Sequence, residues 1–187
     1  MKRSPIRPLF GFSLLVTLAA LTPAGAQEYL TPTKAHEQMS YEVGVWDAEV
    51  SMWEKPDGEP MKNKAVETNK MLGKMWLMSE FEGEFAGAKF SGRSVLGFDP
   101  VKKKYVGGWV DTMSPFIMQM EGEYDADSHT LTMMGEGTDV MSGKPSKMKM
   151  VTRYTGQDDK TFEMYMPVEG EDGKWWKTME AKYMRRK

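Results

Sequence analysis

The sequence contains no cysteine and only two histidines among its 187 residues. A chain without cysteine forms no disulfide and performs no thiol chemistry, so its stability has to come from packing. With His36 and His129 alone, a Ser–His pair or a histidine-rich metal site has few ways to form. A Gly-x-Ser-x-Gly elbow, a phosphate-binding loop and a His-Glu-x-x-His pattern are also absent. We therefore identify no catalytic residue, no metal ligand and no cofactor, and favour a non-catalytic protein.

Long apolar runs are scarce, and the longest is "LFGFSLLVTLAAL" at residues 9–21. It is shorter than the roughly 20 residues that span a bilayer. Basic residues precede it and "AGA" follows it just before Gln27, which is the pattern of a secretory signal peptide. We expect residues 1–26 to be a signal peptide and residues 27–187 to form one domain. The mature protein would be exported, periplasmic or secreted, with no stable membrane anchor after cleavage.

An excess of positive charge is also missing. Without the three basic residues of the expected signal peptide, 22 of the 25 Lys and Arg remain against 27 Asp and Glu, a net charge of −5. Nucleic-acid binding relies on clustered cations, and the run at residues 102–104 is the main basic cluster before the C-terminal "MRRK". We expect no nucleic acid among the partners.

From Trp46 onward, apolar residues occur at about every second position, and turn residues recur about every ten positions. This pattern predicts an all-β fold, an antiparallel meander of about ten strands with one short N-terminal helix. Strands with one polar and one apolar face favour a closed barrel. A two-sheet sandwich stays open as an alternative. The expected strands are 46–54, 62–72, 75–85, 90–98, 104–112, 116–124, 130–138, 146–155, 160–168 and 174–184.

The helix is expected in "TPTKAHEQMSYEVG", residues 31–44. His36, Met39, Ser40 and Val43 would fall on one face of it. Such a helix would plug or border one end of the barrel.

A short pattern after this helix resembles a known superfamily. "GVW", residues 44–46, resembles the Gly-x-Trp of the calycins, the lipocalins and their relatives. The resemblance implies that Trp46 closes one end of the barrel and that a basic side chain near the C-terminus packs over it. Arg185 shares the strand parity of Ala181 and Tyr183, so it is the predicted partner in this closing pair.

A longer segment, "FSGRSVLGFDPVKKKYVGGWVDTMS" at residues 90–114, is similar to the domain of unknown function 1579 family. Members share a Gly-aromatic-Asp turn, a Lys-Tyr pair and a Trp-x-Asp-Ser/Thr-Met segment. The matching residues here are Gly97, Phe98, Asp99, Lys104, Tyr105, Trp109, Asp111, Thr112 and Met113. Phe98 and Thr112 stand where the family often has Tyr and Ser. The resemblance implies a lipocalin-like β-barrel and no established activity.

Asp111 is the unusual residue of that segment, because its surroundings read as buried strand. It shares the parity of Tyr105 and Trp109, which points it inward, and it precedes the tight turn "TMSP". One interpretation is a cap that accepts backbone N–H groups of the turn. The other is a polar anchor at the mouth of an apolar pocket, and the two are compatible.

Methionine is abundant, with 19 residues. The pairs Met118/Met120, Met148/Met150 and Met164/Met166 each share one strand face. Thioethers fill irregular cores, line adaptable apolar pockets and bind Cu(I), and the sequence leaves these readings open.

These observations favour an exported barrel that binds a small apolar or amphipathic molecule, with a small lipophilic ligand as its partner. The expected lining is Trp46, Phe81, Tyr105, Trp109, Met118, Met120, Met148, Met150 and Met164, with Asp111 as polar anchor. A structural or protein-interaction barrel with a packed interior is the alternative. Met-based periplasmic copper binding is a further one, and a hydrolase using Asp111 as base is the most remote.

Overall fold

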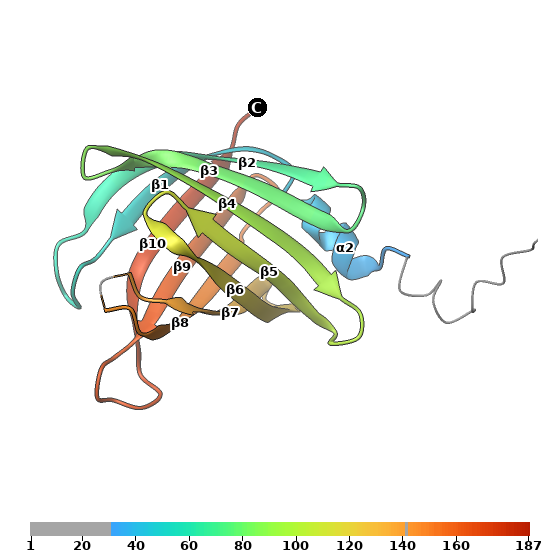
Figure 1. Cartoon of the computed structure of the whole chain (residues 1–187). Coiled ribbons are helices and arrows are strands. Elements are labelled where there is room, and N and C mark those ends of the chain that lie inside the picture. The colour runs from blue at the N-terminus through green and yellow to red at the C-terminus, as the bar shows by residue number, and fades with distance from the viewer. Residues whose placement is uncertain (1–30, 141) are drawn as a thin grey trace, which may run out of the picture. The chain divides into compact units, whose positions relative to one another are not determined.

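The strands of the chain pair in sequence order and then close on themselves. The computed structural model describes residues 31–140 and 142–187. Each of the ten strands pairs antiparallel with its neighbours in the chain, and β1 pairs with β10 to complete the barrel (Figure 1). The predicted all-β meander and its lipocalin-like barrel are confirmed. The expected signal peptide lies outside the described residues.

The strands follow the expected ranges to within a few residues at each end. In chain order they are β1 (Gly44–Met52), β2 (Met61–Leu72), β3 (Trp76–Phe85), β4 (Ala88–Asp99), β5 (Lys104–Asp111), β6 (Ser114–Asp125), β7 (Thr130–Thr138), β8 (Pro145–Tyr154), β9 (Asp159–Pro167) and β10 (Trp175–Arg185).

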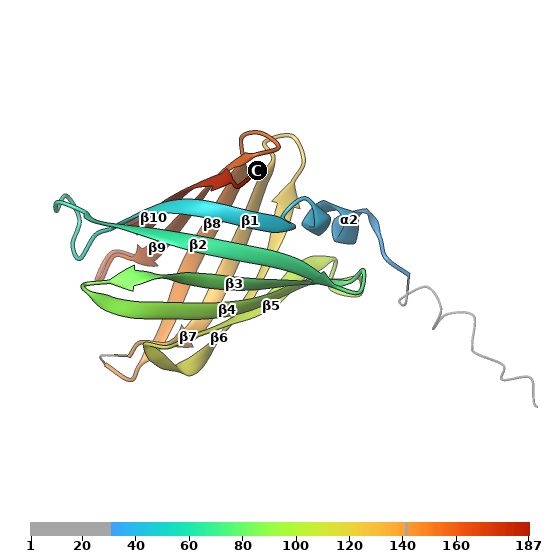
Figure 2. The ribbon, with the colours of Figure 1, turned by 90° about the horizontal axis from the view of Figure 1, so that it is seen from above.

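A short helix, α2 (Lys34–Ser40), lies against β3 and β4 at one end of the barrel (Figure 2). It begins after Thr33, whose backbone N–H donates to Nδ1 of His36 over 3.0 Å. His36 and Met39 are buried, and the Tyr105 hydroxyl donates to the carbonyl of Ala35 over 3.2 Å. The helix therefore closes this end. Within residues 31–140 and 142–187, no helix is long and apolar enough to cross a membrane.

The helix is shorter than the sequence predicted. Ser40 and Val43, expected on the buried face with His36 and Met39, are exposed. Val43 is exposed because α2 ends at Ser40, so the helical spacing no longer applies to it, and β1 begins directly at Gly44. Ser40 is the last residue of the helix, and its hydroxyl donates to the carbonyl of Glu37 on the exposed side.

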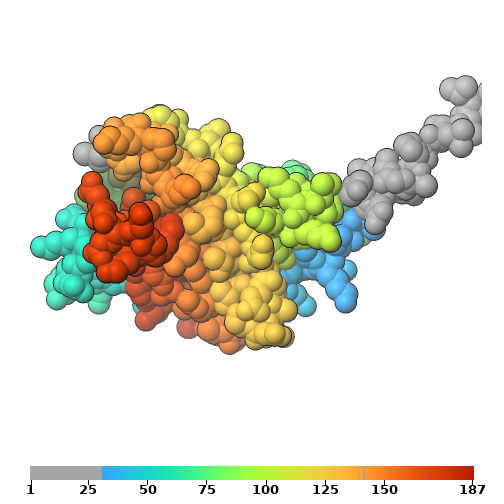
Figure 3. All heavy atoms as spheres, turned by 90° about the horizontal axis from the view of Figure 1, so that it is seen from below, coloured from blue at the N-terminus to red at the C-terminus, as the bar shows by residue number. Residues whose placement is uncertain are grey.

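Alternate residues of each strand face the interior, as the pleat requires. Two groups of buried side chains form the core. The first contains Trp46, Ala48, Val50, Ala65, Phe81, Ala181 and Tyr183. The second contains Met39, Leu77, Tyr105, Leu131, Met133 and Met150. The wall over β6 to β9 is continuous when all atoms are drawn (Figure 3).

The end of the barrel opposite α2 is formed by long and short hairpin turns. These are residues 53–60, 86–87, 112–113, 139–140 with 142–144, and 168–174. We call this end the mouth.

Candidate ligand cavity

A cavity of about 650 Å³ occupies the interior of the barrel. It extends from Glu42 and Lys160 near α2 to Met113 and Val140 at the mouth. Its walls are largely apolar, and nine methionines of the described residues contribute to them: Met52, Met113, Met118, Met120, Met148, Met150, Met164, Met166 and Met179. Sites for small molecules have volumes of roughly 300–1,000 Å³. The cavity is therefore large enough for one.

The inner end of the cavity carries a buried ion-pair network. The Lys160 ammonium pairs with Glu42 and lies 2.7 Å from Oε1 of Glu67. Asn69 donates from Nδ2 to Glu67 over 2.7 Å and to Glu42 over 3.4 Å. The Lys160 side chain is only 5% exposed. We call Glu42, Glu67 and Lys160 the floor triad.

Within the floor triad, neighbouring charges and hydrogen bonds keep Lys160 and Glu67 ionised despite their burial. Burial alone would lower the pKa of Lys160, but the charges and hydrogen bonds of Glu42 and Glu67 outweigh it, so this pKa is raised. Burial likewise opposes ionisation of Glu67, yet Lys160 and Asn69 bring its pKa below the usual value. Glu67 is therefore a carboxylate and Lys160 an ammonium at neutral pH.

Two tyrosines complete the floor. Burial, followed by the charge of the neighbouring carboxylate, raises the pKa of Tyr154 and of Tyr183 well above that of a free phenol. Each phenol stays protonated and donates a hydrogen bond, Tyr154 to Glu42 and Tyr183 to Glu67. The carboxylates are thus satisfied within the protein.

Trp46 separates the floor triad from the outside. The Lys160 ammonium lies 4.6 Å and the Arg185 guanidinium carbon 4.0 Å from its ring centroid, both within cation–π range. The Trp46 indole donates to the carbonyl of Glu42 over 2.9 Å. Arg185 also donates to the carbonyls of Tyr41 and Val43. This is the arrangement that the sequence predicted for the closing pair.

Gly44 is required for this closure. Its φ is +135°, a value that favours glycine, and a Cβ on it would lie 2.9 Å from Nη1 of Arg185. Arg186 instead bonds Asp47 outside the barrel.

The structure brings eight of the ten expected lining residues together around the cavity. They are Phe81, Trp109, Asp111, Met118, Met120, Met148, Met150 and Met164. Trp46 and Tyr105 do not line it, which corrects the expectation for these two. Their parity does turn them inward, but they lie beyond the floor, where Trp46 packs beneath Arg185 and Tyr105 reaches α2.

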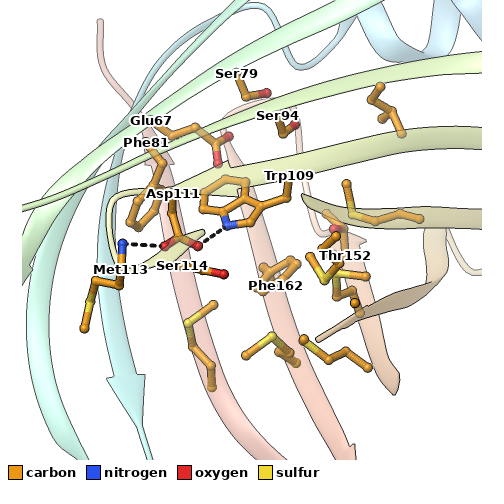
Figure 4. A pocket seen from close by; sticks show the side chains of 18 of the residues that line it. Glu67, Ser79, Phe81, Ser94, Trp109, Asp111, Met113, Ser114, Thr152 and Phe162 are labelled. Carbon is orange, nitrogen blue, oxygen red and sulfur yellow. Dashed lines mark hydrogen bonds between the residues drawn. The ribbon is translucent and has the colours of Figure 1, made fainter. Parts of the chain in front are cut away.

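Asp111 lies at the mouth, beside the rings of Phe81 and Trp109 (Figure 4). Its Oδ2 accepts from the Trp109 indole N–H over 2.8 Å, and its Oδ1 accepts from the backbone N–H of Met113 over 2.8 Å. The second bond is the cap that the turn interpretation requires. The same carboxylate lines the cavity, so the position has the features of both interpretations.

Sequence reasoning missed the floor triad. Lys160 shares the strand parity of Phe162 and Met164, which would have marked it as an inward cation on a dry face. Glu67 shares the parity of Ala65 and Asn69 on β2. No pattern in the sequence linked the two, because they are 93 residues apart.

Four of the cavity's methionines form a continuous row across neighbouring strands. Met150 on β8 is directly opposite Met164 on β9, Met164 is opposite Met179 on β10, and Met179 is opposite Met52 on β1. We call these four the methionine row. Among the described residues, no group of three or more His, Asp or Glu is arranged to hold a metal ion.

Comparison with known proteins identifies a family and a fold. The family model described as "Protein of unknown function (DUF1579)" matches residues 31–185. No curated protein matches the chain. The structure is similar to that of Rv2717c from M. tuberculosis, with a TM-score of 0.63 and 14% identity over 84% of this chain and 100% of that one. It is also similar to the S-type phycobiliprotein lyase CPES from Guillardia theta, with a TM-score of 0.53 and 11% identity over 81% and 92%. At these identities the likeness shows the fold alone.

Proposed function

Since the chain belongs to the DUF1579 family of proteins of unknown function, its role has to be argued from the cavity, and we propose that it binds a small apolar or amphipathic molecule without transforming it. The observation that carries this proposal is the apolar cavity of about 650 Å³ that reaches the mouth. A barrel with a packed interior, the structural alternative, would lack such a space. We also propose that the protein is exported, on the pattern of residues 1–26.

Binding is tested with an uncharged apolar dye such as N-phenyl-1-naphthylamine. We expect the dye to become fluorescent in the cavity and to quench Trp109, which lines it. Ser79→Trp should reduce the affinity at least about tenfold, since Ser79 faces the cavity and the new indole would occupy it. The control is Glu80→Trp, whose side chain is 58% exposed on the outer face, and which should leave the affinity unchanged.

Thermal melts of both variants show whether each one folds. Should Ser79→Trp not fold, Ser94→Phe, on the neighbouring strand of the same wall, replaces it. An unaltered protein that binds no apolar dye would contradict the proposal.

The methionine row favours a second candidate function, the capture of Cu(I). Directly opposed residues on neighbouring strands have Cβ atoms about 4.5–5.5 Å apart, so three flexible thioethers can converge on one ion. Soft thioether ligands select Cu(I) over hard cations. All four residues of the row line the cavity.

The copper candidate is tested under anaerobic conditions by competition with a chromogenic Cu(I) chelator. We expect one Cu(I) per chain, lost when Met150, Met164 and Met179 are all changed to Leu, which keeps the wall apolar. The matched control changes the exposed Met78, Met134 and Met184 to Leu and should retain the ion. Equal retention in both triple variants would exclude the row as a copper site.

A further inference from the structure

We propose that the ligand of this cavity carries a positively charged nitrogen, held at the mouth by Asp111 and the aromatic rings around it. The inference rests on the proposed function, binding of an amphipathic molecule, and specifies its chemical class. Such a ligand would be a lipophilic amine or a quaternary ammonium compound.

The charge of the lining is the first argument. Of the described residues, four carboxylates line the cavity, those of Glu42, Glu67, Asp111 and Asp139, against one ammonium, that of Lys160. Lys160 is already paired with two of these carboxylates at the floor. Between apolar walls charges are screened less than in water. An anionic head group, such as that of a fatty acid, would therefore be repelled.

The second argument is that the protein partners of Asp111, within the described part of the chain, leave room for a cationic ligand. Both of its hydrogen-bond donors are neutral, the indole of Trp109 and the backbone of Met113. Among the residues that the structure describes, no Lys, Arg or His forms an ion pair with it. Each carboxylate oxygen accepts up to two hydrogen bonds. One further N–H donor can thus approach each oxygen.

The third argument is the aromatic group beside this carboxylate. The rings of Phe81, Phe90 and Trp109 lie 6.0–6.4 Å apart between centroids, and Phe85 lies 5.3 Å from Phe90. All four line the cavity together with Asp111. Ring faces attract cations, and quaternary ammonium groups are recognised by groups of aromatic rings. The carboxylate of Asp111 beside these rings adds direct charge pairing.

The position of the head group follows from the contrast between the two ends. At the floor, Lys160 and the two phenols already satisfy Glu42 and Glu67. At the mouth, the carboxylate of Asp111 has no cationic partner among the described residues. The ammonium would therefore lie at the mouth, with its alkyl chain extending along the methionine-lined wall toward the floor.

The test compares three ligands that share one alkyl chain: dodecyltrimethylammonium, dodecan-1-ol and dodecanoate. Each is used to displace N-phenyl-1-naphthylamine at concentrations below its solubility limit and below any concentration at which it forms micelles. We expect the cation to bind about tenfold more tightly than the alcohol, as an ammonium–aromatic contact with charge pairing implies. Dodecanoate should bind more weakly than the alcohol.

Two variants identify the residues that cause the preference for the cation over the alcohol. Asp111→Asn should bring the affinity for the cation down to that for the alcohol, whose own affinity stays within about threefold. Phe90→Leu, which removes a ring and leaves the carboxylate, should reduce the preference in the same direction. The matched control is Glu136→Gln, an equal change of charge on a side chain that is 73% exposed and does not line the cavity. It should keep the full preference.

The outcomes separate this inference from the proposed function. Equal affinities for cation and alcohol in the unaltered protein would overturn the inference and leave binding of an apolar molecule standing. Retention of the preference in both Asp111→Asn and Phe90→Leu would also overturn it. Failure of all three dodecyl compounds and the dye to bind would overturn the proposed function, and this inference with it.

Discussion

Replacing Lys160 with methionine is expected to lower the free energy of unfolding by about 3–5 kcal/mol, the cost of breaking a buried ion pair from one side. The variant leaves the carboxylates of Glu42 and Glu67 side by side without their cation. It also removes the charge that lies over the Trp46 ring. Urea denaturation measures the change, and for a domain of this size each kcal/mol lowers the melting temperature by about 2–4 °C.

Lys147→Met is the matched control, because it removes the same charge from an exposed pair. The Lys147 ammonium lies 3.5 Å from Glu136, with both side chains more than two-thirds exposed, so its loss should cost about 0–1 kcal/mol. Adding Glu67→Gln to Lys160→Met should restore part of the stability, since one of the two buried charges is then gone. A cost below about 1 kcal/mol for Lys160→Met would show that the floor triad is not a stabilising element.

The pH dependence of stability has a predicted sign in each protein. In the unaltered chain the lowered pKa of Glu67 gives stability that is present above the ordinary pKa of a glutamate, 4.5, and is lost as the pH falls through the folded value. The raised pKa values of Lys160, Tyr154 and Tyr183 give stability that is present below about pH 10 and lost at higher pH. In Lys160→Met, burial without a counter-charge raises the pKa of Glu67. That variant should therefore gain stability as the pH falls from 7 toward 5, where the unaltered protein does not.

The barrel could be predicted because most strands alternate cleanly between apolar and polar residues. In β6, for example, Met118 and Met120 face the cavity while Gln119 and Glu121 do not. Strand β2 had no readable inner face, because its inward positions include Glu67 and Asn69. Those residues are polar for a reason that the sequence conceals: Glu67 pairs with a lysine on β9 that it meets only after closure of the barrel, and Asn69 donates a hydrogen bond to Glu67.

The sequence predicted which side chains face the interior of the barrel, but not how far along the barrel axis each of them lies. Because alternate residues of a strand share a face, Tyr105 and Trp109 were predicted to lie on the same side of β5, and both side chains do point inward. Only Trp109 lines the cavity, since Tyr105 is two rungs closer to α2 and packs against that helix. Nothing in the sequence indicated the volume of the cavity, because this volume depends on how side chains from all ten strands pack in the middle of the barrel.

Gly92→Ala is expected to cost about 2–4 kcal/mol, an unusually large effect for one added methyl group. Gly92 lies on β4 opposite Asp111, and the six-membered ring of Trp109 lies directly over it, so that an added Cβ would overlap the indole. The indole would have to move away from the strand. Its hydrogen bond to Asp111 and its stacking on Phe90 would be lost together.

The control for this prediction is another strand glycine, Gly108→Ala. A Cβ on Gly108 would lie 3.5 Å from the carbonyl of Met118, an ordinary contact. The change should be neutral or stabilise by about 0.4–1 kcal/mol, because alanine restricts the unfolded chain. The two substitutions are chemically identical, so opposite signs would isolate the indole as the cause.

A double-mutant cycle with Trp109→Leu tests that cause directly. Leucine lacks the ring that overlaps the new methyl group, so in its background Gly92→Ala should cost less than about 1 kcal/mol, a coupling within the range seen for residues in contact. Equal costs in both backgrounds would mean that β4 itself, and not the indole, resists the methyl group. The expected coupling would instead explain why glycine is needed beneath the mouth: it lets Trp109 lie flat against β4, where its N–H holds the carboxylate that we assign to the ligand's cation.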